Sequence, residues 1–541
     1  MPLSQPAQPL EMSTPDPSPP DGSPPFVSIL FDGPSPDLEI EGCAVPELFT
    51  DLNLDQIVDS ATVGRDQYAL KPFFYLPVEK LETIQYRQEI LRDLESPDLN
   101  AAVSGFSKRM QTMRERLEQS ARLYYEFQKL FLFVDAASAY CAALTQLAGE
   151  LKVIRLSSRG FQSLRDYLNR LISSDSFDRF VCDDRTLKDD IESVRYSLLI
   201  NGNRITVSRH GSERDYCREV LQTFERFRQG AARDYNFPVS FELEMNHVEA
   251  AILDRVARLF PDVFNELRAF VGSHADFIDP TVARFDREVQ FYLAWLDLVR
   301  RIKDSGLSFC YPTVSRSKEI AARDVFDLSL ANRLLAEKRP VVTNDFYLTD
   351  TERIFIVSGP NQGGKTTFAR TFGQLHYLAR LGLTVPGTDA SLFLFDRIFT
   401  HFEREERIED LHSKLEDELI RIRGILDQAT TNSILVMNES FLSTTMRDAL
   451  FLGRQVLERI ARQDALCVSV TFLDELASLS DKTVSMVSTV DPHDPAVRTF
   501  KIVRKSADGL AYAMAIAEKH RLTYKGVRAR LCAKAQEEVV Q

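Results

Sequence analysis

Apolar residues recur every three or four positions along much of the first two thirds of the chain. This spacing places them on one face of an α-helix, so it predicts amphipathic helices that each bury one side. Between residues 46 and 335 the pattern predicts a bundle of long helices rather than an enzyme core. The predicted helical stretches are residues 81–94, 101–151, 160–173, 215–232, 242–268 and 279–305.

A different pattern interrupts the helices at residues 197–208. There apolar and polar residues alternate around an Asn-Gly pair, which predicts a β-hairpin with a type I′ turn. Arg204, Arg209 and His210 lie in or beside this hairpin. Two interpretations of these basic residues remain open: they contact phosphates, or they form a charged face exposed to solvent.

From residue 339 onward, short β-rich runs alternate with helical stretches, which predicts a sheet flanked by helices. The predicted strands are residues 353–358, 391–400, 432–438, 465–471, 483–489 and 499–504. The sequence therefore predicts a multidomain protein, with a helical domain over residues 41–338 followed by an α/β domain over residues 339–541.

The first 40 residues are rich in Pro, Ser and Asp and contain few aliphatic residues. Such a segment buries too little apolar surface to offset the entropy lost on ordering. We therefore expect residues 1–40 to form a disordered, solvated tail.

The clearest chemical signal is an apolar run at residues 354–357 that leads directly into a Gly-x-x-x-x-Gly-Lys-Thr motif. Glycines let successive backbone amides point at phosphate oxygens, and the lysine supplies a positive charge to the β- and γ-phosphates. The threonine hydroxyl is expected to ligate Mg²⁺, and the helix that begins near Thr367 adds its positive end. The residues predicted to bind ATP are Gly359, Pro360, Asn361, Gln362, Gly363, Gly364, Lys365, Thr366 and Thr367.

A second apolar strand, at residues 433–437, ends in Asn438-Glu439. Nucleoside triphosphatases usually carry an acid at the first of these positions to help hold Mg²⁺, and the following glutamate polarises the attacking water. Asn438 brings an amide oxygen without a negative charge, so metal binding is expected to depend more on Thr366 and the phosphates. Glu439 and Lys365 are the predicted catalytic residues.

The composition of the chain limits the classes of protein to which it can belong. The chain has 541 residues, a net charge of −13 and a pI near 5.3, which argues against a uniformly basic nucleic-acid binder. Its seven cysteines are scattered, which predicts reduced thiols in a cytoplasmic protein without a zinc site. No secretory signal is expected. Residues 130–148 are apolar enough to resemble a membrane span, but their charged flanks favour a buried bundle helix.

Residues 358–367, Ser-Gly-Pro-Asn-Gln-Gly-Gly-Lys-Thr-Thr, resemble the Thr-Gly-Pro-Asn-Met-Gly-Gly-Lys-Ser-Thr signature of the MutS DNA-mismatch-repair ATPases. Supporting similarities follow in order at residues 381–386 and at the Asp-Arg-Ile-Phe-Thr of residues 396–400. The resemblance covers residues 341–530 well and the helical region weakly, through residues 76–87. It implies an ABC-type ATPase domain joined to a helical core and lever domain.

The resemblance also implies roles for particular residues. Ser413 is similar to the signature serine that reaches the γ-phosphate of the partner subunit, although a helix N-cap remains an alternative for it. Glu418 resembles the acid of the same helix, and residues 443–445 with Asp448 resemble a loop along the dimer interface. The implied protein is a homodimeric ATPase that uses ATP and Mg²⁺, binds DNA in repair or recombination, and has no membrane partner.

The chain also departs from the family pattern. Besides Asn438, the family's Ala-Thr-His appears as Val470-Thr471-Phe472, so a histidine that would sense the γ-phosphate is missing and slow or differently gated hydrolysis is expected. No counterpart of the mismatch-reading domain is expected, and branched or irregular DNA is the expected substrate. An alternative function is a nucleotide-gated protein-interaction scaffold with weak ATPase activity and no DNA binding.

Overall fold

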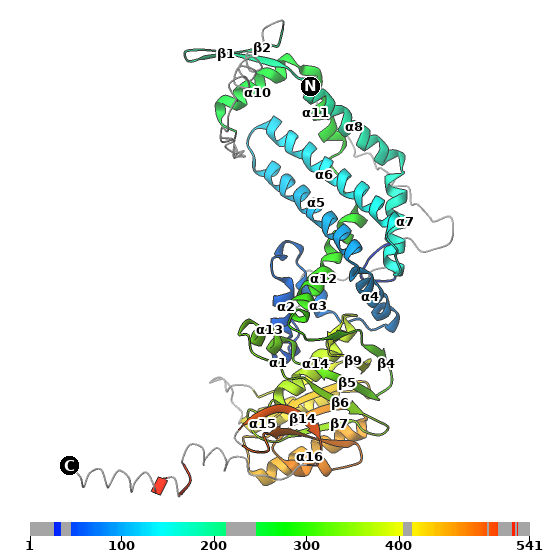
Figure 1. The fold of residues 1–541 in the computed structure, drawn as a ribbon, viewed down its shortest axis with the longest axis vertical. Helices are drawn as coiled ribbons and strands as arrows, with labels where there is room; N and C mark the ends of the chain where they lie inside the picture. The colour runs from blue at the N-terminus through cyan, green and yellow to red at the C-terminus, as the bar shows by residue number, and fades with distance from the viewer. Residues whose placement is uncertain are drawn as a thin grey trace, which may run out of the picture. The chain divides into compact units, whose positions relative to one another are not determined.

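The computed structural model describes residues 26–33, 45–211, 245–403, 414–494, 497–506, 522–524 and 527–528. The chain forms two compact units (Figure 1). Unit 1 comprises Met1–Phe26, Ser96–Ser157 and Phe161–Asp286, and unit 2 comprises Val27–Glu95, Ser158–Gly160 and Arg287–Gln541. This division differs from the predicted boundary near residue 339, because the first helices of the chain belong to the same unit as the C-terminal sheet.

Unit 1 is built from helices, as the periodicity predicts. The predicted stretch 101–151 is two helices, which lie side by side in Figure 1, and the stretch 242–268 is broken before Pro261. Proline lacks an amide hydrogen, so it fits the first turn of a new helix and not the interior of a longer one. The helices are α5 (Pro97–Arg122), α6 (Glu126–Val153), α7 (Arg159–Ile172), α8 (Asp175–Ser193), α10 (His247–Leu259) and α11 (Pro261–Ser273). The predicted helix 215–232 lies outside the described residues.

Helix α6 contains the apolar stretch that resembles a membrane span. It is the one helix in the described part of the chain that is long and apolar enough to cross a membrane. One face of α6, with Tyr140, Leu144, Leu147 and Leu151, is buried within unit 1. That burial fits the expected core helix of a bundle.

The predicted hairpin forms from β1 (Tyr196–Asn201) and β2 (Arg204–Arg209), which pair in antiparallel register. Gly202 has a φ of 59°, and Asn203 has a negative φ. The turn is therefore not type I′, which requires a positive φ at both central residues. The guanidinium of Arg209 donates a hydrogen bond to the Leu259 carbonyl, with Nε at 2.8 Å.

The main sheet of unit 2 has the strand order β10-β11-β12-β7-β13-β14, with every neighbouring pair parallel except β13 and β14. All predicted C-terminal strands are present, with 391–400 divided between two sheets. The strands are β7 (Ile354–Ser358), β10 (Ile398–His401), β11 (Ile434–Asn438), β12 (Leu466–Val470), β13 (Thr483–Val490) and β14 (Arg498–Arg504). Helices α14 (Lys365–Arg380), α15 (Lys414–Gln428) and α16 (Met446–Gln463) belong to the same unit.

A second sheet has the order β4-β9-β5-β6, and β3 pairs with β8. Three of these strands, β3, β4 and β5, lie in the predicted helical domain but after the last helical stretch predicted there, and the sequence did not predict them. Strands of two to six residues show too few positions to display a period of two, and their pairing partners lie far along the chain. The bounds are β3 (Phe309–Cys310), β4 (Thr313–Ser315), β5 (Ile320–Val325), β6 (Asn344–Leu348), β8 (Val385–Pro386) and β9 (Asp389–Phe393).

The N-terminal helices of unit 2 are held by side chains of α14. Arg370 Nε donates to the Asp51 carbonyl at 2.8 Å, and Gln374 Nε2 donates to the Leu52 carbonyl at 2.8 Å. Tyr377 donates its hydroxyl to the Phe74 carbonyl at 2.8 Å. The remaining helices of unit 2 are α1 (Leu48–Leu52), α2 (Leu54–Thr62), α3 (Lys71–Tyr75), α4 (Leu81–Leu94), α12 (Pro280–Lys303, entering from unit 1) and α13 (Leu328–Ala336).

Part of the predicted disordered tail is buried. In residues 26–33, Ile29 and Leu30 are fully inaccessible to solvent, and Glu288 accepts hydrogen bonds from the Ser28 hydroxyl at 2.8 Å and from the Ile29 amide at 2.9 Å. Arg87 Nε donates to the Leu30 carbonyl at 3.0 Å. The prediction of a tail is wrong for these residues, because buried polar side chains elsewhere in unit 2 satisfy their backbone groups.

Asp464 links several strand ends of unit 2 through three cations. Its carboxylate accepts hydrogen bonds from Lys318 Nζ at 2.8 Å, Lys482 Nζ at 2.8 Å and Arg353 Nε at 3.1 Å. Burial raises the pKa of Asp464, but these hydrogen bonds and positive charges outweigh it and hold the pKa well below its usual range. The backbone φ of 59° is tolerated by both Asp and Asn.

We expect Asp464→Asn to lower the free energy of unfolding at pH 7 by about 1–2 kcal/mol, after allowance for solvent screening. The folded pKa lies below the unfolded value of about 3.9, so this contribution is complete above about pH 4 and is lost as the pH falls further. Urea unfolding at pH 7 and pH 3.5 measures the effect, which shrinks at the lower pH. Asp427→Asn, at a surface pair with Arg459, is the control; an equal loss from both variants contradicts the prediction.

Candidate functional site

The glycine-rich loop, residues 359–364, connects the central strand β7 to the first turn of α14. Gly359 and Gly364 have φ values of 113° and 91°, and Gln362 between them has a φ of 60°. Positive φ is costly for residues with a Cβ atom, so glycine permits this tight turn. The loop therefore lies at the carboxyl end of a parallel strand, where ligands of α/β sheets bind.

Close packing also requires glycine at position 363. A Cβ atom there would lie 2.2 Å from Ser488 Oγ and 2.9 Å from the Pro360 carbonyl oxygen. The same serine hydroxyl donates a hydrogen bond to the Gly363 carbonyl at 2.7 Å. Strand β13, which carries Ser488, therefore fixes the back of the loop.

Lys365, the first residue of α14, points into the loop and is only 4% exposed. Its Nζ donates to the carbonyl oxygens of Gly359 and Pro360 at 3.0 and 3.2 Å and to Asn361 Oδ1 at 3.3 Å. Burial lowers the pKa of Lys365, and the negative charge of Glu439 opposes that shift. The ammonium group is thus held at the centre of the loop by neutral oxygens that a phosphate would outcompete.

The two predicted metal residues lie together. Thr366 Oγ1 donates a hydrogen bond to Asn438 Oδ1 at 2.8 Å. This bond connects the first turn of α14 to the end of β11. Two oxygen ligands this close suit a small cation such as Mg²⁺ that keeps several water molecules. Both ligands are neutral, so the pair fits Mg²⁺ that is brought in with a phosphate chain.

Glu439 begins a turn in which two residues take unusual backbone conformations. Glu439 and Phe441 have φ values of 53° and 67°. The Glu439 amide donates to the Val470 carbonyl at 2.9 Å, and the Phe441 amide donates to Glu418 Oε1 at 2.7 Å. The turn after β11 is thereby fixed on both sides of Ser440, and it places the Glu439 carboxylate close enough to raise the pKa of Lys365.

Two residues of the site were missed from the sequence. Arg498 Nε donates to the Asn361 carbonyl at 3.2 Å, and its charge adds to the lowering of the Lys365 pKa, whereas Asp474 raises that pKa. Asp474 follows β12 at the sheet edge that carries the loop, so the position of the strand ends is a signal that points to it. Arg498 begins an antiparallel edge strand and carries no comparable signal.

The remaining residues predicted for the site have no hydrogen bond to the glycine-rich loop among the described residues. Ser413 lies outside the described residues, and Phe472 follows β12 with 41% of its surface exposed. Thr445 caps α16 by accepting a hydrogen bond from the Asp448 amide at 3.2 Å and donating to its carboxylate at 2.8 Å. This pair therefore has a structural role in its own chain, and the interface role remains a prediction.

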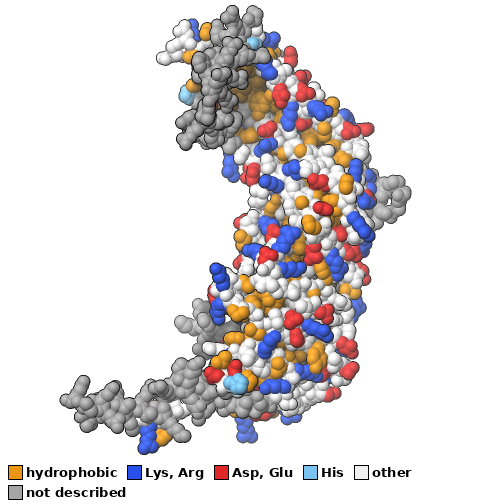
Figure 2. Space-filling model, in the orientation of Figure 1, with side chains coloured by type: hydrophobic (Ala, Val, Ile, Leu, Met, Phe, Trp, Pro, Cys, Tyr) orange, Lys and Arg blue, Asp and Glu red, His pale blue; other side chains and the backbone are white. Residues whose placement is uncertain are grey.

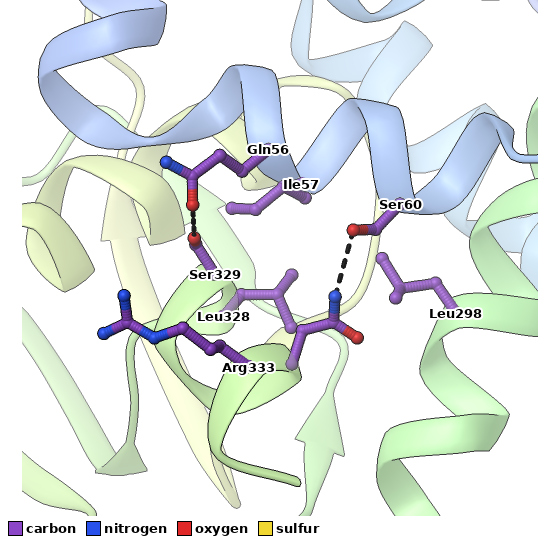
Figure 3. A pocket seen from close by; sticks show the side chains of 8 residues that line it. Gln56, Ile57, Ser60, Leu298, Leu328, Ser329 and Arg333 are labelled. Atoms are coloured by element: carbon purple, nitrogen blue, oxygen red, sulfur yellow. Dashed lines mark hydrogen bonds between the residues drawn. The ribbon is translucent and has the colours of Figure 1, made fainter. Parts of the chain in front are cut away.

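A separate pocket of about 120 Å³ lies between α2 and α13 (Figure 3). Gln56 and Ser329 point toward each other across it, with Ser329 Oγ donating at 2.6 Å, and Asn332 Nδ2 donates to Ser60 Oγ at 3.0 Å. Because these polar groups pair with one another, the pocket is best explained as a hydrogen-bonded seam between two helices.

The chain is similar to known proteins over the region that contains the glycine-rich loop. A family profile described as MutS domain V matches residues 355–539. The DNA mismatch repair protein MutS of Chlorobaculum tepidum is 26% identical over 60% of this chain and 36% of its own length. The corresponding protein of Solibacter usitatus is 28% identical over 58% of the chain and 35% of its length, and endonuclease MutS2 of Lactococcus lactis is 24% identical over 69% and 44%.

Residues 355–539 therefore match MutS domain V. Together with the relatives, this match supports a MutS-related family for the chain. In the three alignments the chain spans less than half the length of each relative.

We expect Asn438→Asp to reduce about tenfold the Mg²⁺ concentration needed for half-maximal ATP hydrolysis, because a carboxylate is a stronger ligand for Mg²⁺ than an amide oxygen. A Mg²⁺ titration at saturating ATP measures this. Thr366→Val, which removes the other predicted ligand, should shift the titration in the opposite direction. The same half-maximal concentration in the wild type and the aspartate variant would show that position 438 is not near the metal.

Proposed function

We propose that the chain is an ATPase of the ABC type that hydrolyses ATP at the glycine-rich loop. The observation that carries this proposal is Lys365, whose buried ammonium group is held by three loop oxygens at 3.0–3.3 Å and lies near the carboxylate of Glu439. A buried cation in a glycine-rich loop, at the start of a helix, is suited to a triphosphate.

In the proposed reaction Lys365 exchanges its carbonyl partners for oxygens of the β- and γ-phosphates. Mg²⁺, when bound at Thr366 and Asn438, would neutralise phosphate charge. Glu439 orients a water molecule and accepts its proton while the water oxygen bonds to the γ-phosphorus. The bond between that phosphorus and the β,γ-bridging oxygen breaks, which gives ADP and phosphate.

We further propose that two copies of the chain pair so that each completes the other's ATP site. This rests on the resemblance of Ser413, and of residues 443–445 with Asp448, to the family's interface segments. Size measurement by light scattering with and without ATP and Mg²⁺ tests it. A mass that stays at that of one chain under all conditions would remove the paired arrangement.

For the partner, we propose DNA of irregular or branched structure, in DNA repair or recombination in the cytoplasm. The printed names of the relatives concern DNA mismatch repair and an endonuclease. Figure 2 shows Lys and Arg side chains interspersed with Asp and Glu over the visible face of the described residues. Binding would therefore depend on local groups of basic residues rather than on a uniformly positive face.

Gel-shift titrations with duplex, mismatched and four-way DNA, with and without ATP and at two salt concentrations, test this partner. Phosphate contacts release counterions, so genuine binding weakens steeply as salt rises. Absence of binding to every DNA would favour the alternative, a nucleotide-gated scaffold for other proteins. The net charge of −13 is the observation that favours that alternative.

A further inference from the structure

The turn that carries Glu439 is held by a buried carboxylate on a neighbouring helix. Glu418, on α15, is 9% exposed and receives the Phe441 amide at 2.7 Å. The same oxygen atom, Oε1, lies 3.2 Å from His401 Nε2. One carboxylate oxygen therefore joins three elements: the end of β10, the second turn of α15 and the turn after β11.

The position of His401 in the sheet directs its ring toward Glu418. His401 is the last residue of β10, where it pairs in register with Met437 of β11, and it is 2% exposed. Its Nδ1 atom is buried without a hydrogen-bond partner in the described structure. Among the described residues, Glu418 is therefore the hydrogen-bond partner of the imidazole.

The balance of forces on Glu418 favours a charged acceptor. Burial raises the pKa of Glu418, but hydrogen bonds from His401 and the Phe441 amide, with the charge of Arg421, outweigh it and hold the pKa below its usual range. A charged carboxylate accepts a stronger hydrogen bond than a neutral group. The hydrogen bond from the Phe441 amide to Glu418 therefore stabilises a turn in which Glu439 and Phe441 have unfavourable positive φ values.

We infer that Glu418, supported by His401, is a positioning residue that fixes the turn carrying Glu439 and so aligns the attacking water for hydrolysis. The inference rests on the proposed ATPase function. Glu418 acts through the Phe441 amide, and neither Glu418 nor His401 contacts the glycine-rich loop in the hydrogen bonds described.

The experiment compares kcat and KM for ATP, and the binding of a fluorescent ATP analogue, in the full chain. Glu418→Ala removes the acceptor and is expected to lower kcat at least about tenfold, because small displacements of a catalytic group are costly. Analogue binding should stay within about twofold, since Lys365 and the loop are untouched. Glu418→Gln keeps an oxygen acceptor and should retain part of the lost activity.

Two further variants separate positioning from stability. His401→Gln keeps a donor where Nε2 lies and should retain more activity than His401→Leu. Ile422→Val, one turn along α15 in the same core, is the matched control and should change neither kcat nor KM. An unchanged kcat in Glu418→Ala, or an equal loss in Ile422→Val, would overturn the inference.

Hydrogen exchange of the Phe441 amide gives a readout that does not depend on ATPase activity. Its protection should fall in Glu418→Ala and persist in Ile422→Val. If the wild type hydrolyses no ATP, the proposed function fails while this exchange result still decides whether Glu418 fixes the turn. Undiminished protection in Glu418→Ala would contradict the positioning role whatever the activity.

Discussion

Replacing Glu439 with glutamine is expected to lower ATP turnover by about 10²–10³-fold while ATP binding is retained. The amide keeps the shape of the side chain, and the turn is held by its backbone contacts to Val470 and Glu418. What is lost is the carboxylate that accepts a proton from the attacking water. Phosphate release under single-turnover conditions, beside equilibrium binding of the ATP analogue, measures the two effects separately.

The matched control for this variant is Glu475→Gln, which changes an acidic residue in the short helix after β12 and should leave turnover unchanged. In the proposed paired arrangement, Glu439→Gln should also accumulate the ATP-bound pair. Turnover equal to that of the wild type would remove Glu439 from the catalytic role, even if ATP still bound.

Lys365→Ala is expected to weaken ATP binding by at least about 100-fold, the second large effect. The substitution leaves the inward-facing oxygens of Gly359, Pro360 and Asn361 without their donor, and it removes the charge that would pair with the β- and γ-phosphates. Isothermal titration with ATP and Mg²⁺ measures the affinity.

Lys303→Ala, at a surface pair with Glu95, is the control for loss of a lysine and should bind ATP as the wild type does. Thermal unfolding without nucleotide should show that Lys365→Ala is folded. Wild-type affinity in that variant would place the nucleotide elsewhere than the glycine-rich loop.

Local signals predicted most of the C-terminal sheet. Strands β7, β11 and β12 are continuous apolar runs that end in glycine or polar residues, so their length and ends are visible in the sequence. The start of α14 follows from the glycine-rich motif alone. The sequence also allowed the prediction that Thr366 and Asn438 lie close together, because both stand at the carboxyl ends of parallel strands, which meet at one edge of the sheet.

Contacts between distant segments were not predictable in this way. The turn at Glu439 depends on Glu418 and His401, which are joined to it only through the sheet register. The burial of residues 26–33 depends on Arg87 and Glu288, and composition alone indicated a solvated tail. In each case a polar side chain far along the chain satisfies a backbone group, and hydrophobic periodicity carries no information about such partners.

The packing of the first helices against α14 determines whether the C-terminal region can be expressed as a separate soluble fragment. Gly373 of α14 is so close to Leu52 that a Cβ atom would lie 2.8 Å from that side chain, and Phe49, Leu52 and Phe74 are almost completely buried. A fragment beginning at residue 339 would expose the apolar surface that these residues cover, together with the unpaired side chains of Arg370 and Gln374. Such a fragment should aggregate on expression, and a separate peptide of residues 26–95 should not suffice to restore it to solution, because residues 287–338 of unit 2 are missing as well.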